Sequence, residues 1–246
     1  MVDIFYEIFS DLPRARPWKS NLYTRAAKLA KAIPMEPMIL DVGCGTGKQT
    51  MELANYFGGK IVALDNHEPF LNILNKKAKT LGYNKLISTM NCDMGNMPFT
   101  DKSFDLIWAE GSIFIIGFKK GLHDWKRLLK EKAYLAISEI SWLKNNPPHE
   151  LKEFFGKEYP GMSSIDQNVQ MIKDEGYKLL DYFVLAPIAW WEDYYIPLEK
   201  RLESLRKKYF ENESELELIE FVQLEIDFYR KYPDVYGYVF YIMQNS

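Results

Sequence analysis

Cysteine and histidine are scarce in this chain of 246 residues, and basic residues show no excess. The 2 cysteines, Cys44 and Cys92, cannot form a disulfide framework, and the 3 histidines are too scattered for the spacing of a zinc site. The 31 Lys and Arg residues are offset by 34 Asp and Glu, which leaves a net charge of −3 and no general basic field to hold a polyanion. We therefore expect neither a metal nor a nucleic-acid partner, and we expect a reducing cytoplasmic location.

Long apolar runs, internal repeats and low-complexity tracts are also missing. No run approaches the ~20 residues needed to span a bilayer, and the first residues carry acids where a signal peptide needs basic side chains. We therefore expect no membrane partner, and a monomer or homodimer. Apolar residues make up 47% of the chain and aromatic residues 15%, which is enough to build a folded core.

From Met38 onward, short apolar runs alternate with amphipathic stretches of helix length. This alternation is typical of βαβ units and a parallel sheet. The pattern predicts strands at 38–42, 60–64, 85–90, 104–109, 133–139, 178–185 and 236–243. It predicts helices at 2–12, 20–33, 47–57, 67–81, 119–130, 147–156 and 165–175.

The predicted fold class is α/β: a Rossmann-like, seven-stranded, mostly parallel sheet with helices on both faces. We expect a single domain over 1–246, with N-terminal cap helices in 1–36 and a core over 37–140 that binds the ligand. Residues 186–235 form a long helical insertion before the last strand. Insertions of this length usually serve as a lid, a binding element or an oligomer contact.

A glycine-rich loop, Asp41–Lys48, directly follows the first strand of this core and opens a helix. Glycines let the backbone approach a ligand closely, and a helix start offers free N–H groups. A P-loop is excluded because Val42 stands in place of its first glycine and Gln49 in place of its serine or threonine. The dinucleotide fingerprint is matched only in part, since Lys48 replaces its last glycine, although Asp65 lies where a ribose-binding acid is expected.

Three acids, Asp41, Asp65 and Asp93, follow three successive predicted strands. Carboxyl ends of parallel strands share one sheet edge, which is where open α/β folds bind their ligands. Together the acids suit a ligand with an ammonium, a ribose diol, an amino-purine and a sulfonium. The alternative for each acid taken singly is capping of the following helix.

Four ordered motifs between Met38 and Glu139 resemble those of class I S-adenosylmethionine-dependent methyltransferases. Asp41–Gly47 looks like the first motif, which cradles the methionine and ribose, and Ala63–Asn66 looks like the second, whose carboxylate accepts hydrogen bonds from the ribose. Asn91–Met94 looks like the third, which meets the adenine, and Phe104–Gly111 looks like the fourth strand with its exit loop. The resemblance implies S-adenosyl-L-methionine as cofactor, bound by Asp41, Gly43, Cys44, Gly45, Gly47, Asp65, Asn66, Asp93, Met94 and Glu110.

The overall layout is similar to small-molecule methyltransferases grouped near the ubiquinone/menaquinone type, although the long insertion departs from the quinone enzymes. The predicted function is methyl transfer to a small-molecule acceptor by in-line displacement. This reaction needs a positioned acceptor and exclusion of water, and it needs no nucleophilic side chain. Two alternatives stay open: an aminopropyl-type transferase on the same scaffold, and a non-catalytic protein that binds or senses the cofactor.

The acceptor side of the site has weaker signals. Glu139, expected to end the fifth strand over the acceptor pocket, and His123, early in the helix after the fourth strand, are candidates for a general base. Helix capping and helix packing are the plainer roles for these two. Aromatic residues expected above the sheet edge could wall an apolar or cationic acceptor, and the alternative for them is core packing. The predicted substrate pocket contains Tyr6, Trp18, Trp142, Trp190, Trp191 and Tyr195.

Overall fold

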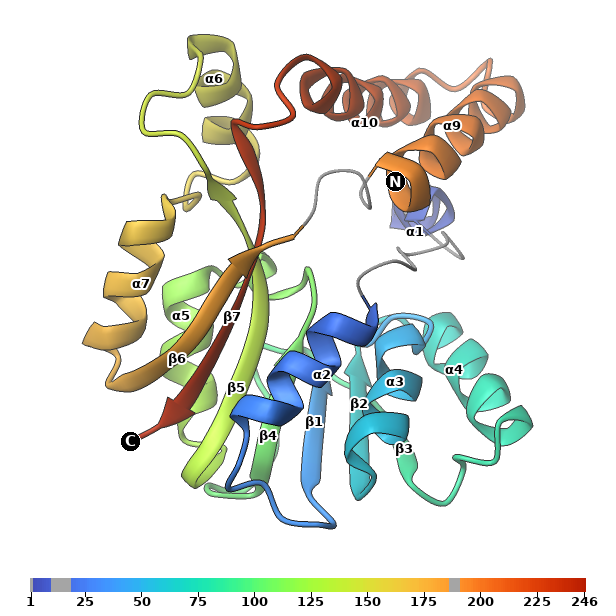
Figure 1. Ribbon diagram of the computed structural model, residues 1–246. Coiled ribbons are helices and arrows are strands. Elements are labelled where there is room, and N and C mark those ends of the chain that lie inside the picture. The colour runs from blue at the N-terminus through green and yellow to red at the C-terminus, as the bar shows by residue number, and fades with distance from the viewer. Residues whose placement is uncertain (1, 10–18, 186–190) are drawn as a thin grey trace.

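One seven-stranded sheet, in the order β3-β2-β1-β4-β5-β7-β6, organises the molecule (Figure 1). The computed structural model describes residues 2–9, 19–185 and 191–246. Neighbouring strands from β3 to β5 are parallel, whereas β7 runs antiparallel to both β5 and β6. The strands are β1 Met38–Val42, β2 Lys60–Asp65, β3 Ile87–Asn91, β4 Phe104–Ala109, β5 Leu129–Trp142, β6 Tyr177–Val184 and β7 Tyr236–Asn245.

Helices cover both faces of the sheet, which confirms the predicted fold class. One face packs against α2, α3 and α4, and the other packs against α5 and α7. These helices are α2 Lys19–Leu29, α3 Lys48–Phe57, α4 Glu68–Thr80, α5 Phe118–Lys126 and α7 Ile165–Asp174. The strand order reverses between β1 and β4, so the switch point at which such sheets bind ligands lies at the carboxyl ends of these two strands.

A further layer of helices lies beyond the carboxyl edge of the sheet (Figure 1). It has its own buried apolar cluster, separate from the two that flank the sheet. β5 and β7 reach into this layer, because their pairing continues up to Trp142 and Tyr236. The layer contains α1 Val2–Phe9, α6 His149–Glu158, the π-helical turn η2 Trp191–Tyr195, α9 Ile196–Lys208 and α10 Glu213–Lys231.

Three of the predicted elements have a boundary that is wrong by more than two residues. The helix predicted over 20–33 ends at Leu29, and the helix predicted over 119–130 ends at Lys126. The fifth strand runs from Leu129 to Trp142 and not from 133 to 139. Leu129 pairs with Phe104 of β4, so sheet pairing overrides the local helical pattern there. Residues 10–12 of the first predicted helix lie outside the described residues.

Within the described part of the chain, no helix has both the length and the apolar character needed to cross a membrane.

Candidate active site

Two glycines of the loop between β1 and α3 leave no room for a side chain. A β-carbon on Gly43 would lie 2.4 Å from Cβ of Ser112, and one on Gly47 would lie 2.3 Å from Cγ of Leu74. Both glycines also have positive φ angles, +70° and +84°. Packing and backbone conformation therefore both require glycine at these positions.

Gly45, between them, faces open space. A β-carbon there would have no heavy atom within 4 Å, while φ is again positive at +53°. The Gly45 amide donates a 2.8 Å hydrogen bond to Oδ2 of Asp65 at the tip of β2. The other oxygen of this buried carboxylate accepts from the His67 amide at 2.9 Å. A ligand can thus approach bare backbone beside a carboxylate that is held in place from two sides.

Asp41, in β1 beneath the loop, is fully buried. Its Oδ2 accepts a 2.6 Å hydrogen bond from the Thr50 hydroxyl, while its Oδ1 has no partner among the described residues. Burial, with a contribution from nearby Glu110, raises the pKa of Asp41 to about 7. A buried acceptor without a donor is uncommon in proteins and fits a donor supplied by a ligand. Neighbouring Cys44 is buried too, and burial raises its pKa, so the thiol is unreactive.

Glu110 follows the tip of β4 and is held firmly. Its Oε1 accepts hydrogen bonds from Nε1 of Trp108 at 2.8 Å and from the Tyr23 hydroxyl of α2 at 2.7 Å. The next two residues fix the exit loop of β4. The Gly111 amide donates to the Ser138 hydroxyl at 2.8 Å.

Ser112 ties this exit loop to the glycine loop. Its hydroxyl donates a 2.8 Å hydrogen bond to the carbonyl of Val42, and its β-carbon occupies the space beside Gly43. The loop after β4 and the loop after β1 therefore form one rigid surface at the switch point of the sheet.

The remaining predicted cofactor residues lie at the tips of β2 and β3. Asp93 is exposed, and its Oδ1 accepts from the Gly95 amide at 2.7 Å. Met94 is half-buried, with its methyl 3.7 Å from the position of a β-carbon on Gly43. Asn66 is exposed beyond Asp65. The structure thus brings the three acids and the glycine loop to one edge of the sheet.

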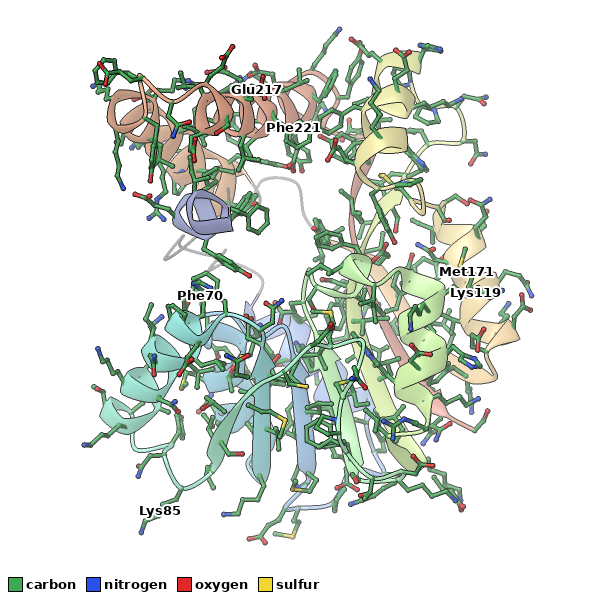
Figure 2. All side chains as sticks on the ribbon, turned by 180° about the vertical axis from the view of Figure 1, so that it is seen from behind. Phe70, Lys85, Lys119, Met171, Glu217 and Phe221 are labelled. Carbon is green, nitrogen blue, oxygen red and sulfur yellow. The ribbon has the colours of Figure 1, made fainter. Side chains whose placement is uncertain are left out.

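Tyr6 of α1 covers the tip of β2. Its ring stacks on His67 with 3.5 Å between ring centroids and 10° between planes, and it meets Phe70 edge-on. Its hydroxyl donates a 3.5 Å hydrogen bond to Oδ1 of Asn66. Figure 2 shows Phe70 beneath α1. Burial and the nearby charge of Asp65 raise the pKa of Tyr6. Tyr6 therefore lies beside the predicted cofactor residues.

A narrow hollow, with room for no more than about one water molecule, opens where β5, β7, α10 and the turn before α9 meet. Its lining residues are Ile140, Tyr195, Tyr229, Tyr236, Gly237 and Tyr238. We call this feature the tyrosine hollow. A β-carbon on Gly111 would lie 3.7 Å from the Tyr238 ring, so the hollow adjoins the exit loop of β4.

Among the predicted pocket residues, Tyr195 lines the tyrosine hollow, and Trp142 and Trp191 pack around it. Trp142 meets Tyr236 edge-on at 6.4 Å, and Trp191 is stacked on Tyr229 at 6.5 Å, both between ring centroids. Trp18 and Trp190 lie outside the described residues.

Three lining tyrosines, Tyr229, Tyr236 and Tyr238, were not predicted from the sequence. Alternation along the last strand puts Tyr236 and Tyr238 on the same face, and this signal could have found them. Tyr229 sits within the charged helix α10, and only the packing of that helix against the β5–β7 pair brings it to the hollow.

His123 lies away from the site. Its side chain is 74% exposed on α5, and its Nδ1 is 3.0 Å from Oε2 of Glu175. The helix begins at Phe118 and rises about 1.5 Å per residue, so His123 lies roughly 7 Å along α5 from its first residue. The side chain pairs with this carboxylate, and the role of His123 as a base stays a prediction.

Glu139 lies within β5 and does not end it, because pairing with β7 continues the strand to Trp142. Side chains alternate along a strand, so Glu139 shares a face with Ile137 and lies on the opposite face from Ile140. Ile137 and Ile140 belong to different apolar clusters, and Ile140 lines the tyrosine hollow, so Glu139 points away from the hollow. Glu139 is 1% exposed, and its Oε1 accepts a 2.6 Å hydrogen bond from the Tyr159 hydroxyl. Its Oε2 has no partner among the described residues, and burial raises its pKa to about 8.

The comparisons with known proteins agree with this geometry. Residues 39–132 match the family model of the methyltransferase domain. This part of the chain is therefore similar to methyltransferase domains, in the region where the four motifs lie. A solved structure of such a methyltransferase from Geobacter sulfurreducens, in complex with S-adenosyl-L-homocysteine, has a TM-score of 0.79 at 16% identity. The alignment covers 98% of this chain and 97% of that one.

Curated relatives match over shorter stretches. Sterol 24-C-methyltransferase of Eremothecium gossypii is 27% identical over 151 residues, which cover 58% of this chain and 40% of the relative. Demethylmenaquinone methyltransferase of Lactobacillus johnsonii is 34% identical over 95 residues, which cover 37% of this chain and 36% of the relative. The chain thus matches less than half the length of both relatives.

Proposed function

We propose that this protein transfers a methyl group from S-adenosyl-L-methionine to a small-molecule acceptor. The observation that carries the proposal is the pairing of an open backbone position at Gly45 with the carboxylate of Asp65 and the unpartnered Oδ1 of Asp41. Asp65 is suited to accept hydrogen bonds from ribose hydroxyls, and Asp41 is suited to face an ammonium group.

The family match and the fold support the same cofactor. Residues that would hold it are Asp41, Gly43, Cys44, Gly45, Gly47, Asp65, Asn66, Asp93, Met94 and Glu110. When bound, the cofactor supplies a methyl group already activated by the positive sulfur. The chain's own residues then orient the acceptor and keep water out, which the rigid surface formed by the loops after β1 and β4 is suited to do.

We infer that the chain works as a single methyltransferase unit over 1–246, with a cap in 1–36, a cofactor-binding core in 37–140 and an insertion in 186–235. Contacts between cap and insertion support this organisation. Glu7 of α1 accepts hydrogen bonds from Lys208 at 2.7 Å and from the Tyr209 hydroxyl at 2.8 Å. Arg201 of α9 also donates to the carbonyl of Glu7 at 3.0 Å.

Calorimetric titration with S-adenosylhomocysteine tests the proposed function. We expect saturable binding to the full chain, and a loss of at least about tenfold in affinity for Asp65→Ala, because two charge-assisted hydrogen bonds disappear. Asp101→Ala is the matched control, since Asp101 is 70% exposed before β4, at the far edge of the sheet. No binding by the unaltered protein, or equal affinity in the Asp65 variant, would overturn the proposal.

A further inference from the structure

We propose that Tyr23 of α2 is a positioning residue for the cofactor site. It holds the carboxylate of Glu110 in the orientation in which Glu110 and Asp41 together receive the ammonium group of the cofactor. This inference rests on the proposed function, and it assigns to the site a residue of the N-terminal cap that lies outside the four sequence motifs.

Two buried side chains donate to the same oxygen of Glu110. The Tyr23 hydroxyl lies 2.7 Å from Oε1, and Nε1 of Trp108 lies 2.8 Å from it. Two bonds from two different elements fix the orientation of a carboxylate more firmly than one bond does. Both hydrogen bonds that the structure describes for Glu110 use Oε1, so Oε2 is the oxygen left to meet a ligand.

Tyr23 is itself held in place by packing. It is 2% exposed, and its ring stacks on Trp108 at 5.0 Å and on Tyr56 of α3 at 5.5 Å, both between ring centroids. Burial and the charge of Glu110 raise the pKa of Tyr23, so its hydroxyl keeps its proton and stays a donor. The cap helix α2 therefore presents a fixed donor to Glu110.

Glu110 and Asp41 lie on the same face of the sheet, which α2 and α3 cover. Glu110 bonds to Tyr23 of α2, and Asp41 bonds to Thr50 of α3. Asp41 is paired with Trp108 across β1 and β4. Glu110 follows Trp108 by two residues, which is roughly 7 Å along the chain. Burial, and then the charge of Glu110, raise the pKa of Asp41, as expected for neighbouring carboxylates.

Two neighbouring carboxylates favour a cation between them, because it offsets their repulsion. Oδ1 of Asp41 has no hydrogen-bond partner among the described residues. An ammonium group carries a positive charge and several N–H donors, so Oδ1 of Asp41 and Oε2 of Glu110 are suited to accept from it. Without the Tyr23 hydroxyl, Glu110 keeps only the bond from Trp108 and is free to turn away from Asp41.

Two ligands test the role of Tyr23. S-adenosylhomocysteine carries the ammonium group, whereas methylthioadenosine keeps the adenosine and the sulfur and lacks the amino-acid portion. We would titrate each into the full chain and into Tyr23→Phe, which keeps the buried ring and removes only the hydroxyl. We expect S-adenosylhomocysteine to bind the variant about threefold to tenfold more weakly, and methylthioadenosine to bind both proteins alike. An equal loss for both ligands would overturn the inference.

A double-mutant cycle shows whether Tyr23 acts through Glu110. Glu110→Ala should weaken S-adenosylhomocysteine binding at least about tenfold, because a charge-assisted hydrogen bond disappears. In the Glu110→Ala background, Tyr23→Phe should add little, since no carboxylate remains to be positioned. Full additivity of the two losses would contradict the positioning role.

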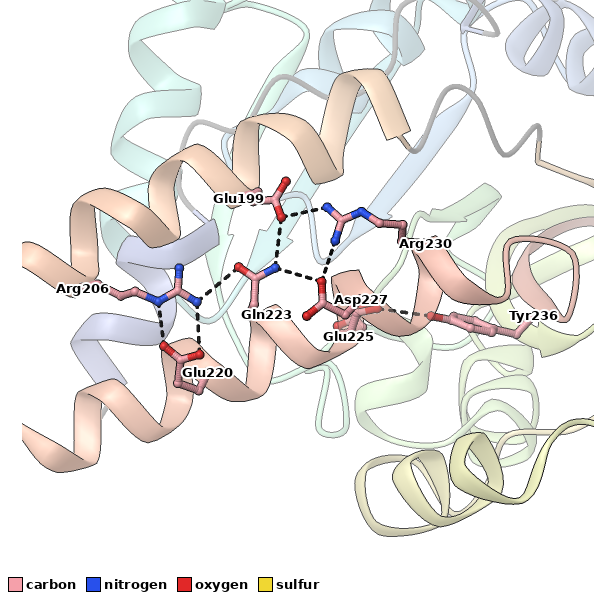
Figure 3. Close-up of polar contacts among 8 residues, drawn as sticks. All are labelled: Glu199, Arg206, Glu220, Gln223, Glu225, Asp227, Arg230 and Tyr236. Carbon is pink, nitrogen blue, oxygen red and sulfur yellow. Dashed lines mark hydrogen bonds and ion pairs between the residues drawn. The ribbon is translucent and has the colours of Figure 1, made fainter.

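Two variants control for general effects. Tyr177→Phe also removes a buried hydroxyl, which donates to the Leu122 carbonyl at 2.9 Å on the other face of the sheet. Glu220→Ala also removes a carboxylate held by two donors, since Nε and Nη2 of Arg206 lie 2.6 Å and 3.2 Å from its oxygens (Figure 3). Both variants should bind S-adenosylhomocysteine as the unaltered protein does. A loss in Tyr177→Phe equal to that in Tyr23→Phe would mean that general loosening explains both.

The unaltered protein separates this inference from the proposed function. If it binds S-adenosylhomocysteine and Tyr23→Phe binds equally well, Tyr23 has no positioning role and the methyltransferase proposal stands. If the unaltered protein does not bind S-adenosylhomocysteine, both proposals fall.

Discussion

At the scale of single residues, the three glycines of the loop between β1 and α3 are required for different physical reasons. Gly43 and Gly47 are packed against Ser112 and Leu74, whereas Gly45 has a positive φ and faces open space. The sequence motif assigns all three glycines to cofactor binding. The sequence alone could not tell which of them are required by packing, because their packing partners lie far along the chain.

Alanine substitutions should reveal this difference. Gly45→Ala should lower the free energy of unfolding by about 1–2 kcal/mol, the cost of a left-handed backbone for alanine. Gly47→Ala adds a clash with Leu74 and should cost about 1–3 kcal/mol more. Urea unfolding measures both values. Equal stability of the two variants would contradict the packing argument, while calorimetry should show that Gly45→Ala also weakens S-adenosylhomocysteine binding.

The raised pKa of Glu139 predicts that the free energy of unfolding depends on pH. Its pKa is about 8 in the folded protein and about 4.5 when unfolded, so the folded state keeps a proton that the unfolded state releases between these values. Stability therefore falls as the pH rises from 4.5 to 8. The Glu139→Gln variant has no such titrating group, so its stability should not fall for this reason. Its free energy of unfolding should therefore exceed that of the unaltered protein by an amount that grows between these two pH values. The excess should reach a few kcal/mol at most, on the order set by ~1.4 kcal/mol per pKa unit.

Unfolding in urea at several pH values between 5 and 9 measures this advantage. Asp41, whose pKa is also raised, titrates in both proteins, so the difference between them isolates Glu139. A difference that does not vary with pH would show that Glu139 is ionised in the folded protein.

At the scale of elements, α1 links the insertion to the tip of β2. Eight residues are too few for a helix that is stable alone. Apolar contacts of Ile4 and Ile8 and the bonds to Glu7 therefore hold α1 against α9 and α10. Tyr6 extends from the other side of α1 to His67.

From this position we predict that Tyr6 helps to close the proposed cofactor site. Tyr6→Ala should weaken S-adenosylhomocysteine binding by about threefold to tenfold, since a stacked aromatic contact contributes ~0.5–1.5 kcal/mol. Phe5→Ala is the control on the same helix, because Phe5 is 50% exposed. Calorimetry compares the two variants, and equal effects would mean that α1 acts only through its general stability.

Elements were predictable where local pattern and tertiary context agree. β1 and β4 match their predicted bounds because both are short apolar runs buried on both faces. The predicted fifth strand is shorter than β5. The first residues of β5 have a helical pattern and its last residues have a loop-like pattern, and only pairing with β4 and β7 makes them part of the strand. Similarly, the acids at the strand tips follow from local motifs, whereas the tyrosine hollow brings together residues up to about a hundred positions apart along the chain.

At the scale of the whole molecule, three apolar clusters divide the structure into a sheet with two covered faces and a separate helical layer. This division predicts that the helical layer loosens independently. Leu202→Ala, at a fully buried position of α9, should lower the stability of the layer by about 2–5 kcal/mol. Leu224→Ala, at a 44% exposed position of α10, should have little effect.

Hydrogen exchange measures this behaviour along the chain. In Leu202→Ala, amides of α9 and α10 should exchange faster, while those of β1 and β4 keep their protection. Uniform acceleration across all strands would show instead that the molecule unfolds as one cooperative unit.

The antiparallel strand β7 also sets the timing of assembly. β6 lies at the end of the sheet and pairs with β7, which follows it in the chain only after α9 and α10. During synthesis on the ribosome, β6 emerges some fifty residues before its neighbour and must wait with bare backbone groups along both sides. We therefore expect the nascent chain to be open to mispairing in that interval, and we expect the pairing of β7 with β6 to end it.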